Sequence, residues 1–439
     1  MENISLWGKL SNGRSFKMKN GRLFCHLCVF LEVTTFMNKY LLLACLALIG
    51  SQTMGITPNE FKGTDSERIA QALAVLKTQG GGTLRIPRRE DADGRAFWLI
   101  DEAILLDADT TLIIENCMIK LSDRCRDNFI RSANCGYGIE DIKTINNVHV
   151  VGIGNAVLMG ADNPRATGDS GKQLGVRTYG TDAGKEGETQ NGDWRNIGVL
   201  MACVDGFSVQ GVSIVDSHCW AMSFEHCKNG LLSHLNFKST SKKVIGDKTV
   251  TMLNQDGIDL RQGCHNIVIE AITGYTGDDL IALTAIGKST LKSGLYGHTM
   301  ISGMMPTDDN DITNIQIRNV TGHSAGRCQV IRFLNTGGDK INHIILDGLI
   351  DNSPKGFESH ATIRIGDHNP NWGGVTPLGD TSDFIITNVH GNSKACILIA
   401  GSLVNSIISN VINHYPGCGP ITYESGQDYV KDVMMTNLR

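Results

Sequence analysis

Short segments in which apolar and polar residues alternate recur along most of the chain after residue 80. Several share one template: Asn or Asp, an alternating apolar triplet, a polar residue, then Asn, Gly or Ala before Val, Ile or Leu. Residues 314–320, 383–389 and 405–411 follow it. Alternation of this kind predicts β-strands. We place their centres at 111–114, 148–151, 207–209, 267–269, 315–317, 344–346, 384–386 and 406–408.

The spacing of these segments predicts a coil. Their starts lie 22 to 28 residues apart, or about two such periods apart, with no helical pattern between them. Repeats of this length indicate a solenoid. We therefore predict an all-β fold, a single-stranded right-handed parallel β-helix. A β-sandwich or a propeller is the alternative, although propeller repeats are longer and carry Trp signatures.

Residues 64–79 carry the strongest helical pattern. Apolar Ile69, Leu73 and Leu76 fall three or four positions apart, and polar residues 64–66 precede them as caps. Three glycines at 80–82 end the helix, and residues 83–87 read as a strand. Because the end units of a solenoid must cover its core, we predict that this helix caps the N-terminal end of the coil.

The first 55 residues differ from the rest. A positive segment begins at Met37, and residues 40–50 form an apolar run of signal-peptide length that is too short for a membrane span. We predict an upstream extension over 1–36, a signal peptide over 37–55 and one β-helix domain over 56–439. The protein would then be secreted or periplasmic. A lipid anchor at Cys45 and a buried N-terminal helix are the alternatives.

Composition narrows the function classes. Hydrophobic residues make up 41% and charged residues 19% of the 439 residues, so the chain can bury a large core. A net charge of −5 argues against a general nucleic-acid binder. The ten cysteines after residue 55 show neither CxxC pairs nor metal-ligand spacing. We expect them in the core, with one or two disulfides compatible with export.

One segment interrupts the repeat. Residues 162–196 are polar and rich in glycine, which predicts a long loop extruded from one coil. Long loops in compact folds are usually functional, so this one could wall a groove. Trp194 and Arg195 are its best candidates for contact with a sugar, through stacking and charge. The alternative is a solvent-exposed loop without a function in binding.

The main candidate catalytic residues are three aspartates. Asp256 lies in Asn-Gln-Asp-Gly-Ile-Asp-Leu, and Asp278 and Asp279 follow in Gly-Asp-Asp-Leu-Ile-Ala-Leu. A coil of about 22 residues would put Asp256 one rung, about 4.8 Å, from the pair. Carboxylates that close keep at least one proton near neutral pH. An acid beside an ionised base suits hydrolysis. Asp259 alternates with apolar neighbours and should also point outward.

The segments around these carboxylates resemble the family 28 glycoside hydrolases, the polygalacturonase-like enzymes of the pectin-lyase-like β-helix superfamily. That family has Asn-Thr-Asp, Asp-Asp, Gly-His and Arg-Ile-Lys motifs. The matching residues here are Asn254-Gln255-Asp256, Asp278-Asp279, Gly297-His298 and Ile331-Arg332-Phe333-Leu334. Gln replaces Thr in the first motif, and Leu334 stands where the Lys is expected. Gly322-His323 is a weaker match to the third motif.

The resemblance implies a role for each matched residue. Asp278 would protonate the leaving oxygen, and Asp256 and Asp279 would activate water. His298 would support the acid, and Arg332 would bind substrate. The family's Lys helps to hold a substrate carboxylate, so Leu334 puts a polygalacturonate substrate in doubt. Inverting hydrolysis without metal or organic cofactor is the implied reaction.

Residues just before the carboxylates complete the predicted substrate site. Asn254 begins the first motif, and His218 and Trp220 lie in the preceding coil, where Trp220 suits the core equally well. The predicted partner is a polysaccharide or oligosaccharide of acidic or pectic type. Two other function classes stay open: a calcium-dependent polysaccharide lyase on the same coil, and a non-catalytic glycan-binding β-helix such as an adhesin.

Overall fold

The computed structural model describes residues 55–439 except 90–92, 126, 137–138, 140, 165–171, 174–188, 191–193, 287–308, 336 and 371–372, together with residues 7–9 and 15–17. The chain divides into two units, 1–54 and 55–439. In the first, β1 (Trp7–Lys9) and β2 (Ser15–Lys17) pair antiparallel. The predicted signal peptide over 37–55, with Cys45, falls almost wholly outside the described residues.

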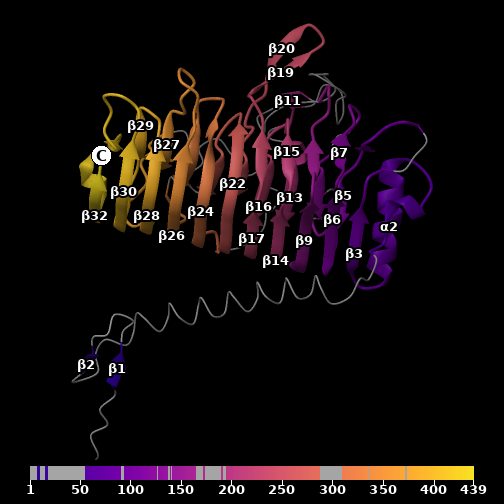
Figure 1. The fold of residues 1–439 in the computed structure, drawn as a ribbon, viewed down its shortest axis with the longest axis horizontal. Coiled ribbons are helices and arrows are strands. Elements are labelled where there is room, and N and C mark those ends of the chain that lie inside the picture. The colour runs from indigo at the N-terminus through magenta and orange to yellow at the C-terminus, as the bar shows by residue number, and fades with distance from the viewer. Residues whose placement is uncertain are drawn as a thin grey trace, which may run out of the picture. The chain divides into compact units, whose positions relative to one another are not determined.

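Residues 55–439 form the predicted right-handed parallel β-helix (Figure 1). Successive rungs stack their strands side by side along the coil, and each strand pairs in parallel with its equivalent in the next rung. Ile385 in one rung, for example, pairs with Ile407 in the next. The same stacking repeats on each face, so residues far apart in sequence become neighbours across one rung.

The strands of the coil lie in two long parallel sheets, one of which folds over two faces. The folded sheet contains β3 (Gly82–Ile86), β4 (Trp98–Ile100), β6 (Thr110–Glu115), β7 (Met118–Leu121), β9 (Ile145–Ile153), β10 (Val157–Met159), β14 (Val204–Gln210), β15 (Ser213–Val215), β17 (Lys228–Ser233), β18 (Asn236–Lys238), β22 (His265–Thr276), β24 (Ile312–Ser324), β26 (Ile341–Asp351), β28 (Thr381–Gly391), β30 (Leu403–Asn413) and β32 (Val430–Leu438). The other sheet, called the site sheet below, contains β5 (Ile104–Leu106), β8 (Ile130–Ser132), β13 (Val199–Ala202), β16 (Met222–Glu225), β21 (Ile258–Leu260), β23 (Ile281–Ala285), β25 (Gln329–Asn335), β27 (Ala361–Ile365), β29 (Ala395–Ile399) and β31 (Ile421–Tyr423).

Among the described residues of 55–439, two short antiparallel strand pairs and three short helices lie outside the two sheets. Hairpin β19–β20 stands out from the coil (Figure 1). Short strands also pair antiparallel within the long polar loop. Their bounds, with those of the short helices, are β19 (Lys242–Ile245), β20 (Lys248–Thr251), β11 (Lys172–Gln173), β12 (Thr189–Gln190), η1 (Pro58–Glu60), η2 (Trp194–Asn196) and η5 (Gln427–Tyr429).

The repeated template corresponds to the two bends of a rung. Asn314 and Asn319 have φ of 58° and 54°, and Asn405 and Asn410 have 48° and 55°. This left-handed region is tolerated by Asn and Gly far better than by most residues. The template therefore places Asn, Asp or Gly where the backbone must bend, and the first and third residues of the triplet between them are buried. Asn405 lies 22 residues after Asp383, its partner on the preceding rung, whereas Asn314 lies 48 residues after its partner Asn266. The spacing differs because longer segments leave the coil between some strands.

Asn314 offers a direct test of this explanation. Its side chain also donates a hydrogen bond of 2.7 Å to Asn266 Oδ1 of the preceding rung. We expect Asn314→Ala to lower the free energy of unfolding by about 1–3 kcal/mol, from the backbone conformation and the lost hydrogen bond. Asn314→Gly removes the same hydrogen bond but accepts the positive φ, so it should cost less. Chemical denaturation of both variants gives the comparison, and equal losses would contradict the backbone explanation.

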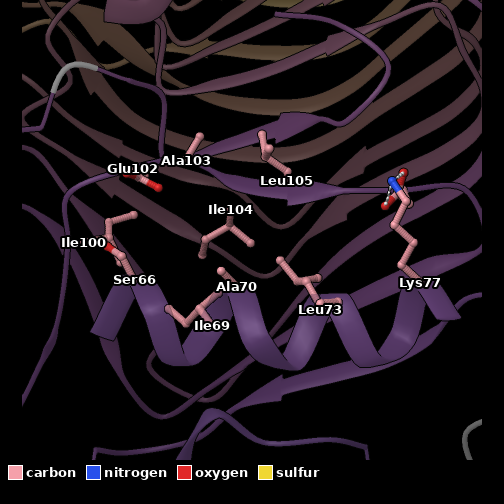
Figure 2. Close-up of a pocket in the computed structure, with 12 residues that line it drawn as sticks. Ser66, Ile69, Ala70, Leu73, Lys77, Ile100, Glu102, Ala103, Ile104 and Leu105 are labelled. Atoms are coloured by element: carbon pink, nitrogen blue, oxygen red, sulfur yellow. Dashed lines mark hydrogen bonds and ion pairs between the residues drawn. The ribbon is translucent and has the colours of Figure 1, made fainter. Parts of the chain in front are cut away.

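The predicted capping helix is confirmed as α2 (Asp65–Thr78), with Thr64 and Glu67 forming a capping box. Figure 2 shows α2 packed across the first coil, with Ile69 and Leu73 turned toward Ile104 of β5. Lys77 at the end of the helix pairs with Asp107 at 3.2 Å. The groove between α2 and β5 is mainly apolar, and α2 serves to cover the end of the core.

Apolar ladders fill the interior of the coil. Phe207 and Phe224 stack with ring centroids 5.0 Å apart, and both are almost wholly buried. Cys227 and Cys264, on neighbouring rungs, are likewise fully buried. The ten cysteines of residues 55–439 are all free thiols, and eight of them are buried. The prediction of core cysteines is therefore confirmed for these eight, and disulfides are not formed among the described cysteines.

Candidate active site

The three predicted carboxylates lie just before two neighbouring strands of the site sheet. Ile258 of β21 pairs with Ile281 of β23, which puts Asp256 in line with Asp279 on the next rung. The Gly257 N–H donates to Asp279 O at 2.9 Å and continues this register beyond the strands. Asp256 and the Asp278-Asp279 pair thus lie on successive rungs, just before strands that are buried along their whole length.

All three carboxylates line one pocket on the outside of the coil. The pocket has a volume of about 220 Å³ among the described residues. It is smaller than the ~300–1,000 Å³ that is usual for drug-sized ligands, so it suits part of a chain such as one sugar ring. Its lining residues are Trp220, Asn254, Asp256, Asp259, Arg261, Asp278, Asp279, Ala282, Thr284, Arg332 and Leu334.

Asp279 is the most buried of the three predicted catalytic carboxyls, with 1% of its surface exposed. It accepts a hydrogen bond of 2.7 Å from the Gln329 N–H and lies 3.5 Å from Arg332 Nη1. Burial, and next the negative charge of Asp278, raise the pKa of Asp279 to about 7, against the opposing effect of Arg332. Asp279 therefore keeps its proton up to near-neutral pH.

This raised pKa has a consequence for stability. The folded state holds a proton on Asp279 that the unfolded chain, with a pKa near 3.8, has already lost between pH 4 and 7. The stabilising contribution is therefore full below about pH 4 and disappears as the pH rises through about 7. We expect the difference in unfolding free energy between the wild type and Asp279→Asn to shift by a few kcal/mol between pH 4.5 and 7.5, to the wild type's disadvantage at pH 7.5. Urea denaturation at both pH values measures this difference, and a constant difference would contradict the assignment.

Arg332 lies on β25, beside the carboxylates, and is held by protein acids. Its Nη1 is 3.5 Å from Asp279, and its Nη2 donates to Asp367 Oδ2 at 3.0 Å. Arg332 and then Arg364, which pairs with Arg332 on the next rung, lower the pKa of Asp367 against the effect of its burial. Leu334, two residues after Arg332, points into the same pocket.

The first motif combines one pocket residue with one structural residue. Asn254 lines the pocket and has φ of 53°. Gln255, the substitute for the family's Thr, is buried, donates to Ser217 O at 2.5 Å and accepts from the Ser241 N–H at 3.0 Å. Gln255 therefore joins the preceding rung to the base of hairpin β19–β20 and sets the backbone that carries Asp256.

A thiol completes the surroundings of the Asp pair. Cys328 hydrogen-bonds to Asp278, and ligand atoms of Cys328, Asp278 and Asp279 lie within 4.8 Å of one another. These three groups are the described residues that could hold a metal ion. Burial, followed by the two aspartates, raises the pKa of the Cys328 thiol well above its usual range. A protonated thiol is a poor metal ligand, and calcium prefers oxygen.

The other predicted site residues lie at different distances from this centre. Trp220 lines the pocket while packing against Ile197 and Leu200. His218 is buried, and its Nε2 accepts from the Ala161 N–H at 2.9 Å. It is not among the residues that line the pocket. His298 falls outside the described residues.

The two predicted sugar contacts of the long loop lie at its C-terminal end. Trp194 and Arg195 belong to η2, and Arg195 is 7% exposed. The Arg131 guanidinium lies 4.9 Å from the Trp194 ring centroid, and Trp194 packs against the buried cluster that contains Trp220. The structure brings neither residue into the pocket lining.

The weaker His candidate lies elsewhere. His323 belongs to β24 of the folded sheet, where it stacks on Tyr275 and bonds to Asn352 Oδ1 at 2.8 Å. It is not one of the residues lining the pocket.

Sequence reasoning missed Arg261 and Asp367 among the residues of the site. Arg261 lies 4.4 Å over the Trp220 ring and lines the pocket together with Asp259, which was expected to point outward. The alternation of Ile258, Asp259, Leu260 and Arg261 was the available signal for Arg261. Asp367 could not be found this way, because 35 residues separate it from Arg332 and only the coil brings the two together.

Part of the chain matches a known protein family. Residues 141–322 match the glycosyl hydrolases family 28, a range that contains Asp256, Asp278, Asp279 and His298. No curated protein matches the chain. The predicted resemblance to family 28 is confirmed, and with it the assignment to the glycosidases.

Several solved structures are similar to this chain. A hyperthermoactive exopolygalacturonase from Thermotoga maritima is 14% identical, with a TM-score of 0.50 over 87% of this chain and 91% of that chain. A polygalacturonase from Erwinia carotovora ssp. carotovora is 13% identical, with a TM-score of 0.46 over 85% and 91%. PfbA, a surface adhesin of Streptococcus pneumoniae, is 12% identical, with a TM-score of 0.46 over 88% and 92%. At these identities the likeness concerns the fold alone.

Proposed function

We propose that this family 28 glycoside hydrolase cleaves a glycosidic bond in a pectic-type polysaccharide or oligosaccharide with inversion of configuration. The observation that carries the proposal is the convergence of Asp256, Asp278 and Asp279 from successive rungs on one pocket. The similar exopolygalacturonase from Thermotoga maritima supports the pectic class of substrate. The proposal needs no metal or organic cofactor.

Asp278 is the proposed general acid. It is more exposed than Asp256 and Asp279, so its carboxyl can reach a glycosidic oxygen that enters from solvent. In the proposed reaction, Asp278 carries the proton and Asp279 is ionised. The proton passes to the leaving oxygen as the bond between that oxygen and the anomeric carbon breaks.

Asp256 and Asp279 are the proposed bases. A water molecule between them attacks the anomeric carbon from the face opposite the leaving group, and the carboxylates take its proton. Arg332 and the Gln329 N–H hold Asp279 in place and favour its ionised form. One water is consumed in each cycle, and solvent returns a proton to Asp278. His298 is proposed to assist the acid, and Arg332, Asn254, Trp220, His218, Trp194 and Arg195 remain the proposed substrate contacts.

The two alternative functions, a lyase and a glycan-binding β-helix, would require different features of the site. A lyase would need calcium held by oxygen ligands, yet one of the three groups that converge beside the pocket is the Cys328 thiol. A glycan-binding β-helix would need no buried carboxyl with a raised pKa. Perturbed acids in a pocket are a feature of catalytic sites. Both observations favour hydrolysis.

Incubation with a panel of pectic oligosaccharides tests the proposal. Products should appear in the presence of a chelator, carry no unsaturated sugar by ultraviolet absorbance, and show the inverted anomer by NMR at early times. Retention of configuration would contradict the assigned roles. Loss of activity in the chelator together with an unsaturated product would establish the lyase instead.

We further propose that the protein acts outside the cytoplasm, after cleavage of the segment that begins at Met37. The described residues contain no helix long and apolar enough to cross a membrane. Polymeric pectic substrates are met outside the cell, which agrees with export. Mass determination of the N-terminus of the exported protein tests the predicted cleavage near residues 50–55.

A further inference from the structure

One wall of the pocket is apolar beside the carboxylates. Leu334 on β25 is 5% exposed, and it pairs in register with Thr284 of β23. Ala282, which pairs with Arg332, lines the pocket two residues earlier. An aliphatic side chain offers a charged group no hydrogen bond, and it displaces the water that would otherwise solvate that charge.

The guanidinium groups of the same wall are already matched by protein carboxylates. Arg332 pairs with Asp279 and Asp367. Arg364, its neighbour on the next rung, is 3.5 Å from Asp367 and 3.0 Å from Glu424. A substrate carboxylate would have to compete with these acids, of which Asp279 and Asp367 are buried, for the two cations. Their positive charge is therefore committed to holding the site together.

The remaining charges of the pocket favour an uncharged ligand. Among its described lining residues, four are aspartates and two are arginines, namely Arg261 and Arg332. Arg261 is 1% exposed and lies against the Trp220 ring. An additional carboxylate would meet like charges in a buried setting, where they repel more strongly than in water. A neutral sugar avoids this repulsion and can pack an apolar edge on Leu334.

We propose that the sugar bound in this pocket, whose anomeric carbon is attacked, is a neutral sugar and not a uronate. The inference rests on the proposed hydrolysis of a pectic-type chain and adds which kind of residue of that chain is recognised. Leu334 and Ala282 form the surface against which its uncharged edge packs. Acidic sugars are then confined to the parts of the substrate outside this pocket.

The identity of the new reducing end tests the proposal in the wild-type protein. Pectic polysaccharides that contain both neutral sugars and uronates are digested, and the products are labelled by borodeuteride reduction and sequenced by mass spectrometry. The sugar from this pocket becomes the new reducing end, so we expect neutral sugars there. Uronates at the new reducing end would overturn the inference while leaving the proposed hydrolysis intact. Absence of any cleavage would overturn the proposed function and the inference with it.

Leu334→Lys provides the second test, with Leu334→Met as the matched apolar control. The substrates are the oligosaccharide identified above and a counterpart that differs only by a carboxylate in place of the neutral C6 group. An ammonium group near the bound sugar should favour the substrate with the carboxylate. The kcat/KM for that substrate, divided by the kcat/KM for the neutral one, should rise at least about tenfold. Leu334→Met should keep the wild-type ratio. An unchanged ratio in a folded Leu334→Lys protein would contradict the role of this wall, and the reducing-end analysis decides if that variant does not fold.

Discussion

Asp278→Asn is expected to lower kcat about 10²–10⁴-fold on substrates with an unactivated leaving group, because the amide has no proton to donate. The replacement is close in size, and Asp278 is less buried than its neighbour Asp279, so the coil should fold normally. Substrate binding should persist, since the remaining pocket residues are unchanged. Initial rates measured by reducing-sugar release, with binding followed by calorimetry, give both quantities.

The leaving group provides an internal control for this experiment. An aryl glycoside with an acidic phenol needs little protonation, so Asp278→Asn should lose far less activity on it than on an oligosaccharide. Asp428→Asn, at an exposed position in η5, is the matched substitution outside the pocket and should leave activity unchanged. Equal losses on activated and unactivated substrates would show that Asp278 is not the acid. Undiminished activity in Asp278→Asn would exclude the proposed hydrolytic mechanism.

Arg332→Met is expected to destabilise the folded protein by about 3–5 kcal/mol near neutral pH. The substitution keeps much of the apolar bulk but takes the cation from Asp279 and Asp367, both 1% exposed. The pKa of each carboxyl then rises in the folded state, so the folded protein binds more protons than the unfolded chain. Stability of the variant should therefore recover as the pH falls toward 4. Guanidinium denaturation across pH 4–8 measures both effects.

The double variant Arg332→Met/Asp367→Asn separates charge from packing. It removes one of the two carboxylates that Arg332→Met leaves without this partner, so it should be more stable than Arg332→Met alone. The single variant Asp367→Asn completes the double-mutant cycle. A loss in Arg332→Met that is the same at pH 4 and pH 8 would mean that packing, not charge, is responsible.

The sequence by itself determined the repeat and the principal acids. Asn, Asp and Gly at the bends, with apolar triplets between them, predict the coil because few other residues adopt the backbone conformation that each bend requires. The capping helix could also be predicted from the pattern of residues between Thr64 and Gln79. Asp256 and the Asp278-Asp279 pair could be placed on successive rungs because their spacing is close to the shortest period of the coil.

Tertiary structure alone decided the environment of those acids. Burial and the charge of Asp278 raise the pKa of Asp279, while Gln329 and Arg332, which come to it from the next rung, oppose that rise; Gln329 is 50 residues away in sequence. Asp367, Glu424 and Cys328 join the site in the same way, from rungs whose spacing varies with the length of the segments that leave the coil. A periodic pattern fixes which face a residue occupies. It does not fix which residues become neighbours across rungs of unequal length, and those neighbours set the charge and burial of the pocket.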